Sequence, residues 1–596
     1  MSHPWIEYSV IAAYLLLMLV IGVVFKNFNK NSSDYFRGGS QGTWWIVGMS
    51  SFMAGISAFT FTGNGGAAFE AGWTVLFIYL GNCAALLLHV FFLAPWFRQM
   101  RATTFPEVIR ARFGPVTQQV YAALAMLLFL TTGAVWLFGL AIFTATAFGL
   151  PIHFTIPVLG VVVLFYSTTG GKWAVMAADF VQGLIMMSMT LLIAVLCVAK
   201  FGGIGGFLAA IEAAGLSQEY RFFKAPGDFP GNAYTLEWAM AMFVVQTTLM
   251  CSAQQAVKYF AVKDGREARR AAWLTLLLMA LGSLMWFVPP VAARILFAEE
   301  VLASGMSKPA EAAFAVVSVQ LLPVGLIGMM VVAMFSATMS SMDAGLNGNA
   351  AMAVRDLLPA ICRRFGWKLP GESGQLLAGR IVTITFGLAV IALALRLSMV
   401  KGKGVFEFAV ALGPLLVVPM SIPLLLCLFI RRVPPWAALA SMAATLVPST
   451  MAFLAETPWT LGEKTLWSFL SGTGVFLLSG LFWGQTSSPY RQQVEEFFST
   501  MHRPVDFATE VGQANDSTQL EIMGRFSVAV GTFVLLLLLA PNPASGRWAI
   551  FSLAAFLIGV GLGMIWTARR RAAAANQRIS VPPGSKRTGT PAHHKK

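Results

Sequence analysis

Residues 334–345, MFSATMSSMDAG, decide how this sequence is interpreted, because they continue the apolar run LLPVGLIGMMVVA of residues 321–333. That run is suited to lipid, yet three serines, one threonine and Asp343 fall within residues 336–343. A charge at the centre of a bilayer costs about 2.5–3.5 kcal/mol on insertion scales, so such a residue normally faces a protein interior or a water-filled path. The stretch therefore predicts a functional site inside a membrane.

The composition of the whole chain is typical of a polytopic membrane protein. Of 596 residues, 57% are apolar and only 11% are charged, whereas a soluble domain is roughly 25% charged. Apolar runs of about 18 residues or more recur, and each is long enough to cross a hydrocarbon core as a helix. The alternation typical of a membrane β-barrel is absent. We therefore expect an all-α polytopic membrane protein with about 15 transmembrane helices.

The expected spans are residues 5–26, 43–64, 67–97, 117–148, 153–169, 173–200, 237–262, 268–298, 321–354, 376–398, 404–430, 433–454, 463–484, 524–541 and 546–567.

The basic residues indicate the orientation of these spans. Groups of lysine and arginine follow the first, third, seventh, ninth and eleventh spans, and they begin at Lys26, Arg98, Lys258, Arg355 and Arg431. Because lysine and arginine are enriched in cytoplasmic loops, we expect the N-terminus outside the cell membrane and the C-terminus in the cytoplasm. The net charge of +15 is then explained by these loops, and we expect no nucleic-acid partner.

The polarity of the chain also suggests its division. Residues 1–484 are expected to form a transport domain, and the polar residues 485–523 a cytoplasmic linker. Two extra membrane helices are expected in residues 524–567, followed by a disordered basic tail in residues 568–596. The N-terminus, MSHPWIEY, lacks the basic region and cleavage site of a signal peptide, so we expect the first span to be retained.

Oxygen ligands are predicted on one face of the ninth span. Ala337, Ser340 and Ser341 share that face because they are spaced at i, i+3 and i+4, and Asp343 lies one turn beyond Ser340. Hydroxyl and carboxylate oxygens are hard ligands that suit Na⁺ better than a soft metal. The alternative is that the serines bond back to carbonyls four residues earlier and that Asp343 caps a kink.

A break is predicted in the second span. Glycines at positions 55, 63, 65 and 66 interrupt the sequence TWWIVGMSSFMAGISAFTFTGNGGAAF of residues 43–69. A break at this depth releases backbone carbonyls, which are tolerated only where they line a cavity or bind an ion. The alternative is that the small residues only permit close helix packing. A second intramembrane carboxylate, Asp179, lies about two turns into the sixth span.

Five motifs, in chain order, resemble those of the sodium:solute symporter family, which includes sodium-coupled galactose, proline, iodide, pantothenate and sialic-acid carriers. The resemblance covers roughly residues 5–484. The motifs are WWIVGMSSFMAGISAFTFTG (44–63), TFPEVIRARFG (104–114), YSTTGGKWAVMAADFVQG (166–183), SAQQAVKYFAVKDGREARRAA (252–272) and SATMSSMDAGLNGNAAMAVRDLL (336–358).

The resemblance implies a leucine-transporter-like fold and sodium-coupled import of a small organic solute by alternating access. Two five-helix repeats, the second to sixth and the seventh to eleventh spans, would be inverted relative to each other within about residues 43–430. The remaining helices would be peripheral. The family is one of carriers, so we expect no enzymatic activity.

The resemblance also implies the ligands of the sodium ion. They would be the carbonyl oxygens of Met53, Ile56 and Ala337 and the hydroxyls of Ser340 and Ser341.

The two intramembrane carboxylates match positions near a second ion. Asp179 matches the family's aspartate near the inner sodium path. In some members that aspartate and hydroxyls below the first pair bind a second sodium, and here Asp343 and Ala344 take two of those positions. Three alternative roles for Asp343 stay open: binding Na⁺, binding a proton, or hydrogen bonding to neighbouring hydroxyls.

The substrate positions are implied by comparison with the galactose carrier of the family. They are Thr60, Tyr79, Gln254, Gln255 and Val410, and they offer few of the paired contacts that a sugar needs. We therefore expect a smaller or less polar solute. A solute carboxylate would be placed near the broken helix end at residues 60–63, where backbone N–H groups point inward.

Two other functions fit parts of the sequence. The first is a proton-coupled carrier in which Asp343 or Asp179 titrates. The second is a membrane sensor that binds a solute without net transport. The five cysteines lack the spacing of metal ligands, so Na⁺ is the only expected metal ion.

Overall fold

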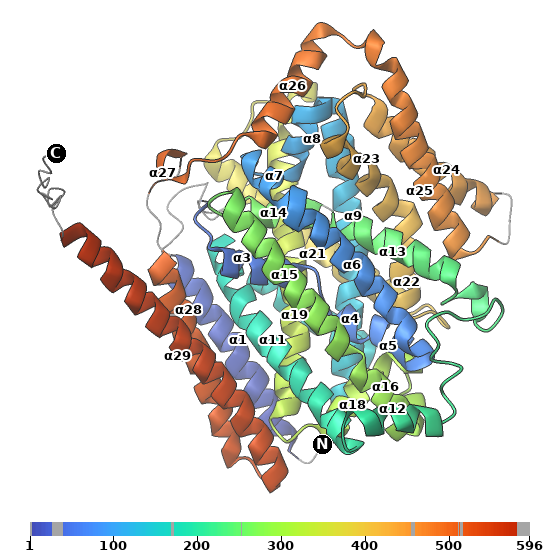
Figure 1. Ribbon diagram of the computed structural model, residues 1–596, viewed down its shortest axis with the longest axis vertical. Helices are drawn as coiled ribbons and strands as arrows, with labels where there is room; N and C mark the ends of the chain where they lie inside the picture. Colours follow the sequence, from blue (N-terminus) through green and yellow to red (C-terminus); the bar gives the residue numbers. More distant parts are fainter. Residues whose placement is uncertain are drawn as a thin grey trace, which may run out of the picture.

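Helices occupy every expected span in the computed structural model, which describes residues 3–26, 40–167, 172–251, 253–454, 459–510, 512 and 516–580. Within these residues, twelve helices are long and apolar enough to cross a membrane. The three remaining spans are filled by shorter apolar helices at Trp44–Ala54, Ile152–Ser167 and Ala437–Ala452. The predicted all-α membrane fold is thus confirmed (Figure 1).

In chain order the α-helices are α1 (Pro4–Lys26), α3 (Trp44–Ala54), α4 (Ala58–Phe61), α5 (Gly63–Ala71), α6 (Leu76–Leu88), α7 (Ala94–Gln99), α8 (Phe105–Phe113), α9 (Pro115–Phe148), α10 (Ile152–Ser167), α11 (Lys172–Lys200), α12 (Ile204–Ala213), α13 (Leu236–Met250), α14 (Ala253–Tyr259), α15 (Gly265–Trp286), α16 (Val288–Leu296), α17 (Ala298–Leu302), α18 (Ala313–Leu321), α19 (Leu326–Met352), α20 (Leu358–Phe365), α21 (Glu372–Ser398), α22 (Val405–Leu412), α23 (Val418–Phe429), α24 (Ala437–Leu454), α25 (Leu461–Leu478), α26 (Ser488–His502), α27 (Phe507–Glu510), α28 (Asp516–Leu536) and α29 (Ala544–Ser580).

The first helix of each expected repeat is broken. The second span divides into α3 and α4, and the seventh into α13 and α14. In the first break, Ser57 has extended backbone angles (φ −152°, ψ 179°), so the helix cannot continue through it. Around this break, α3 packs against α11, α15 and α19, which places the break in the middle of the bundle.

The boundary between the second and third spans lies further along the chain than the sequence indicated. The expected gap was at residues 65–66, but α5 continues through Ala71 and the chain turns at Gly72 (φ +62°). A β-carbon at Gly72 would lie 2.4 Å from Cγ of Tyr220. Glycine is therefore required at this turn both for its backbone conformation and for the close approach of the Tyr220 ring.

The first helix is joined to the helix of the predicted oxygen ligands by a buried carboxylate. Glu7 of α1 is 1% exposed, and it accepts hydrogen bonds from the backbone N–H groups of Gly325 (2.7 Å) and Gly328. These are among the N–H groups at the start of α19 that have no partner within the helix. A carboxylate is also favoured there by the helix dipole.

We expect Glu7→Gln to lower the free energy of unfolding by about 1–3 kcal/mol, because one of the two buried N–H groups loses its acceptor. The measurement is thermal or denaturant unfolding of the purified protein in detergent. Ser9→Ala, which removes an exposed hydroxyl on the same helix, is the matched control. Equal stability of the two variants would contradict this role.

A buried lysine fixes the loop before α13 to the turn at Gly72. The Lys224 ammonium is 4% exposed and donates to the carbonyl oxygen of Ala71 (2.9 Å) and the hydroxyl of Thr74 (3.2 Å). Burial, together with the nearby Arg221 guanidinium, lowers the pKa of Lys224 to about 8.

We expect this lysine to make the protein more stable as the pH rises from about 8 to 10.5. In that interval the unfolded chain, with an ordinary lysine pKa of 10.5, holds more protons than the folded chain, so raising the pH favours the folded state. The measurement is the melting temperature across this range. Lys224→Met should remove part of the rise, and an unchanged profile in that variant would contradict the assignment.

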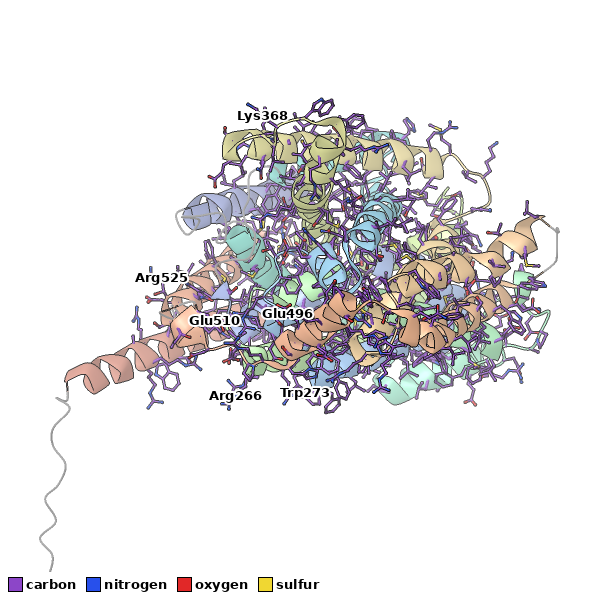
Figure 2. All side chains as sticks on the ribbon, turned by 90° about the horizontal axis from the view of Figure 1, so that it is seen from above. Arg266, Trp273, Lys368, Glu496, Glu510 and Arg525 are labelled. Atoms are coloured by element: carbon purple, nitrogen blue, oxygen red, sulfur yellow. The ribbon has the colours of Figure 1, made fainter. Side chains whose placement is uncertain are left out.

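The expected polar linker is a folded part of the protein. Within residues 485–523, α26 packs against α7 and α8 through Tyr490, Val494, Phe497, Phe498 and Met501, which are all buried. Figure 2, which looks onto this end of the molecule, labels Glu496 of α26 and Glu510 of α27 in front of the helical bundle. This helix and the residues up to Glu510 are called the strap below.

Two arginines hold the strap. Arg112 of α8 is fully buried and donates to the Tyr490 hydroxyl (2.8 Å) and to the carbonyl oxygen of Arg431 (2.9 Å). Arg101 forms a paired interaction with Glu510, with N–O distances of 2.7 and 2.6 Å, and this guanidinium lowers the pKa of Glu510.

The last two helices form a hairpin beside the core (Figure 1), where α28 and α29 pack against α11. The expectation of a disordered tail from residue 568 is wrong for its first part, since α29 continues to Ser580. The run Ala572–Ala575 follows three arginines, and alanine and arginine both favour a helix. Residues 581–596 lie outside the described part of the chain.

Candidate functional site

The break between α3 and α4 faces the serines of α19. The Ser341 hydroxyl lies 2.7 Å from the carbonyl oxygen of Ile56 and 3.4 Å from that of Met53. The Thr338 hydroxyl accepts a hydrogen bond from the backbone N–H of Ala58 (2.9 Å). Backbone groups released by the break are therefore gathered around one turn of α19.

Ser340 and Ala337 lie on the same turn. Ser340 is 2% exposed, and its hydroxyl has no hydrogen-bond partner within the described residues. Because buried hydroxyls are nearly always hydrogen-bonded, the Ser340 hydroxyl is a candidate to contact a ligand. Ser336, by contrast, donates to the Tyr14 hydroxyl (2.9 Å) and belongs to the contact with α1.

The intramembrane carboxylate of Asp179 belongs to a buried ion pair. Its Oδ2 lies 3.1 Å from Nζ of Lys258 and accepts a hydrogen bond from the Ser50 hydroxyl, and Lys258 also donates to Ser50 (2.8 Å). Both charged side chains are at most 2% exposed. The sequence grouped Lys258 with the cytoplasmic cations, although the expected span 237–262 contains it. In the structure Lys258 lies within α14 and is buried, so it is not a loop cation.

Asp343 lies deeper along α19 and is 2% exposed. Its Oδ1 accepts a hydrogen bond from the side-chain amide of Asn347 (2.9 Å), one turn further on. The sequence left open Na⁺ binding, proton binding or a bond to neighbouring hydroxyls for Asp343, and these roles stay predictions.

A cavity of about 120 Å³ adjoins the helix break. It is lined by four of the five predicted substrate positions, namely Thr60, Tyr79, Gln255 and Val410, and Ser341 lies at its boundary. The side chain of the fifth, Gln254, lies outside the described residues. Gln255 also exchanges hydrogen bonds with Ser51, whose hydroxyl donates to Oε1 (2.8 Å).

Sequence reasoning missed several polar residues of this cavity. Asn64 donates to the Tyr79 hydroxyl (2.9 Å), and Asn82 and Gln246 also line the wall. Asn82 lies within the apolar helix LFIYLGNCAALLL, where a polar side chain is itself a sign of function.

Aromatic rings close another part of the cavity wall. The rings of Phe59 and Phe406 stack at a centroid distance of 6.5 Å and an interplanar angle of 10°, and both residues line the cavity. The backbone N–H of Phe406 donates to the buried Glu311 carboxylate (2.9 Å). The start of α22 is thereby held over the site.

Comparison with known proteins gives one consistent result. The model of the sodium:solute symporter family matches residues 35–444. Similar curated proteins include the sodium/sialic acid symporter NanT of Aliivibrio fischeri, 24% identical over 75% of this chain and 87% of that protein. The sodium/glucose cotransporter 2 of Rattus norvegicus is 25% identical over 71% of this chain and 68% of that protein.

Among solved structures, a Na⁺-coupled sialic acid symporter in its substrate-bound outward-open state superposes with a TM-score of 0.67. It is 20% identical, and the match covers 81% of this chain and 98% of that one. The likeness shows a common fold, as expected for a leucine-transporter-like bundle with broken helices.

Proposed function

Because the chain belongs to the sodium:solute symporter family, we propose that the sodium ion it transports binds between α3, α4 and α19. The ligands are the carbonyls of Met53, Ile56 and Ala337 and the hydroxyls of Ser340 and Ser341. The chain is a membrane-embedded, sodium-coupled solute symporter and not an enzyme. The observation that supports the ion site most directly is the 2.7 Å separation of the Ser341 hydroxyl and the Ile56 carbonyl oxygen.

Coupling follows from the position of this site. An ion that holds α19 against the break stabilises only conformations in which the two lie together, and coupling requires such a difference in affinity between states. The cavity shares Ile56 and Ser341 with the ion site. Ion binding therefore orders two residues of the solute site. The membrane potential adds about 2.3 kcal/mol per charge per 100 mV.

Four of the predicted solute positions, Thr60, Tyr79, Gln255 and Val410, are assigned to this cavity, and Gln254 is retained with them on the family resemblance. Asp179 and Asp343 are assigned to coupling or to a second ion. The pairing of Asp179 with Lys258 favours a coupling role for Asp179, because its charge is already compensated.

The arrangement of the chain in the cell membrane is also proposed. The N-terminus lies outside, and the strap and the C-terminal end of α29 lie in the cytoplasm. This orientation places the basic residues at 98–112, 263–270 and 363–364 on the cytoplasmic side. Residues 1–484 carry transport, and α28 and α29 are peripheral.

The test is uptake of a candidate solute by the purified protein in lipid vesicles. We expect accumulation driven by an inward Na⁺ gradient, which collapses when choline replaces Na⁺. A second arm imposes a pH gradient without Na⁺. Accumulation in that arm alone would overturn the sodium site in favour of proton coupling through Asp343 or Asp179. Binding with no accumulation under either gradient would indicate a sensor.

A further inference from the structure

The described residues that line the cavity beside the helix break carry no charged side chain. Among the described residues of its wall there is no aspartate, glutamate, lysine, arginine or histidine. The polar groups are amides and hydroxyls, supplied chiefly by Asn64, Asn82, Gln246, Thr60 and Tyr79. Moving an ionised solute from water into such a site requires a compensating charge or several hydrogen bonds.

Three backbone N–H groups at the break already have partners. The N–H of Ala58 donates to Thr338, that of Thr60 to the Ser57 carbonyl, and that of Thr62 to the Ala58 carbonyl. These three N–H groups are used within the protein, and α4 has only four residues. They therefore add little to the binding of the solute carboxylate expected near residues 60–63.

One buried amide points to what the cavity accepts. Asn82 is 4% exposed and lines the cavity, and its amide oxygen has no hydrogen-bond partner within the described chain. An unsatisfied buried acceptor is unfavourable, and a solute O–H or N–H would satisfy it. The Asn64 amide, in contrast, is already bonded to Tyr79.

The size of the cavity limits the solute further. Its 120 Å³ is well below the roughly 300–1,000 Å³ of sites that hold drug-sized ligands. The stacked rings of Phe59 and Phe406 and the side chain of Trp136 form part of the wall and restrict its width.

We propose that the transported solute is a small, uncharged molecule with O–H or N–H donors, such as a short-chain amide or polyol, and that Asn82 is its principal hydrogen-bond acceptor. This inference rests on the proposed function, because it takes the cavity as the solute site. It differs from the expectation drawn from the sequence in excluding a carboxylate.

The experiment compares solutes of matched shape. Purified full-length protein is melted in Na⁺ and in choline medium with propanamide, propanoate and propylammonium, and with glycerol, glycerate and glucose. We expect a Na⁺-dependent rise in melting temperature for at least one of the two small neutral solutes, because a ligand that binds the folded state stabilises it. The charged analogues and glucose should have smaller effects. Solutes that stabilise the protein are then tested for Na⁺-driven accumulation.

Two variants sharpen the result. Asn82→Leu, which keeps the size of the side chain, should raise the half-maximal concentration of the neutral solute about tenfold, as expected for the loss of one buried hydrogen bond. Asn82→Asp should allow propylammonium to bind better than propanamide. The proposal is overturned if a charged analogue stabilises the wild type more than its neutral counterpart, if neither small neutral solute stabilises it, or if Asn82→Leu has no effect.

Melting in Na⁺ without solute tests the proposed ion site separately from the proposed solute class. Na⁺ without any solute should raise the melting temperature of the wild type and of Asn82→Leu alike, but not that of Ser341→Ala. If Na⁺ alone has no effect on the wild type, the ion site is wrong whatever the ranking of solutes. If Na⁺ stabilises the protein as expected and the charged solutes are preferred, only the solute class is wrong.

Discussion

Ser341→Ala is expected to reduce sodium-driven uptake at a fixed Na⁺ concentration by about 10- to 100-fold, which corresponds to roughly 1.4–2.8 kcal/mol of lost ion binding. The hydroxyl of Ser341 lies 2.7 Å from the Ile56 carbonyl oxygen and within 3.4 Å of two others. Together with Thr338, which accepts a hydrogen bond from the Ala58 N–H, it joins α19 to the helix break. Without the Ser341 hydroxyl, the proposed ion site would lose one ligand, and the carbonyls would lose their hydrogen bond from Ser341.

The measurement is the Na⁺ dependence of initial uptake in vesicles. We expect the Na⁺ concentration for half-maximal uptake to rise, with partial recovery at high Na⁺. Ser336→Ala is the matched control, because Ser336 is a buried serine on the same helix but bonds to Tyr14. A normal Na⁺ dependence in Ser341→Ala, or an equal defect in Ser336→Ala, would show that the hydroxyl acts through packing alone.

The second large effect is expected from the buried ion pair. Asp179→Asn should leave the Lys258 ammonium without its counter-charge, and Lys258→Met should leave the carboxylate. Removing one partner of a buried pair costs about 3–5 kcal/mol, whereas replacing both by apolar residues is often nearly neutral. Both side chains are at most 2% exposed, so water does not screen the charge that remains.

A double-mutant cycle measures this coupling. Asp179→Leu, Lys258→Met and the combined variant are unfolded in detergent, and the free energies are compared. We expect each single variant to be less stable than the double variant. Additive losses would mean that the two charges are stabilised independently. Vesicle uptake by the double variant then separates stability from coupling, since a stable but inactive protein indicates that the pair takes part in transport.

Much of the architecture follows from the sequence. Apolar runs locate the membrane helices, because only a helix satisfies its own backbone in lipid. Glycine and small residues indicate the break after Ala54, and helical spacing puts Ser340 and Ser341 on one face. The convergence of these two elements depends on the tertiary arrangement, and only the family resemblance anticipated it.

Other features were present in the sequence but were ambiguous. From the sequence, Lys258 resembles the basic residues of a cytoplasmic loop. A short helix that follows a helix break has no sequence pattern that separates it from the start of a loop. The strap carries Tyr490, Val494, Phe497 and Met501 at helical spacing, a pattern typical of an amphipathic helix. Because residues 485–523 also carry charges of both signs, the sequence favoured a polar linker and not an amphipathic helix. Asn82 is a single polar residue in an apolar helix, and nothing local shows which way it faces.

The anchoring of the strap has a mechanical consequence for the transport cycle. Arg112 joins α8, the connection between α23 and α24, and α26 through hydrogen bonds to Tyr490 and to the carbonyls of Ile430 and Arg431. One guanidinium thus links three segments that are far apart in the chain. We expect these segments to move together as one rigid unit during the transport cycle, with the hinge residues outside these three segments.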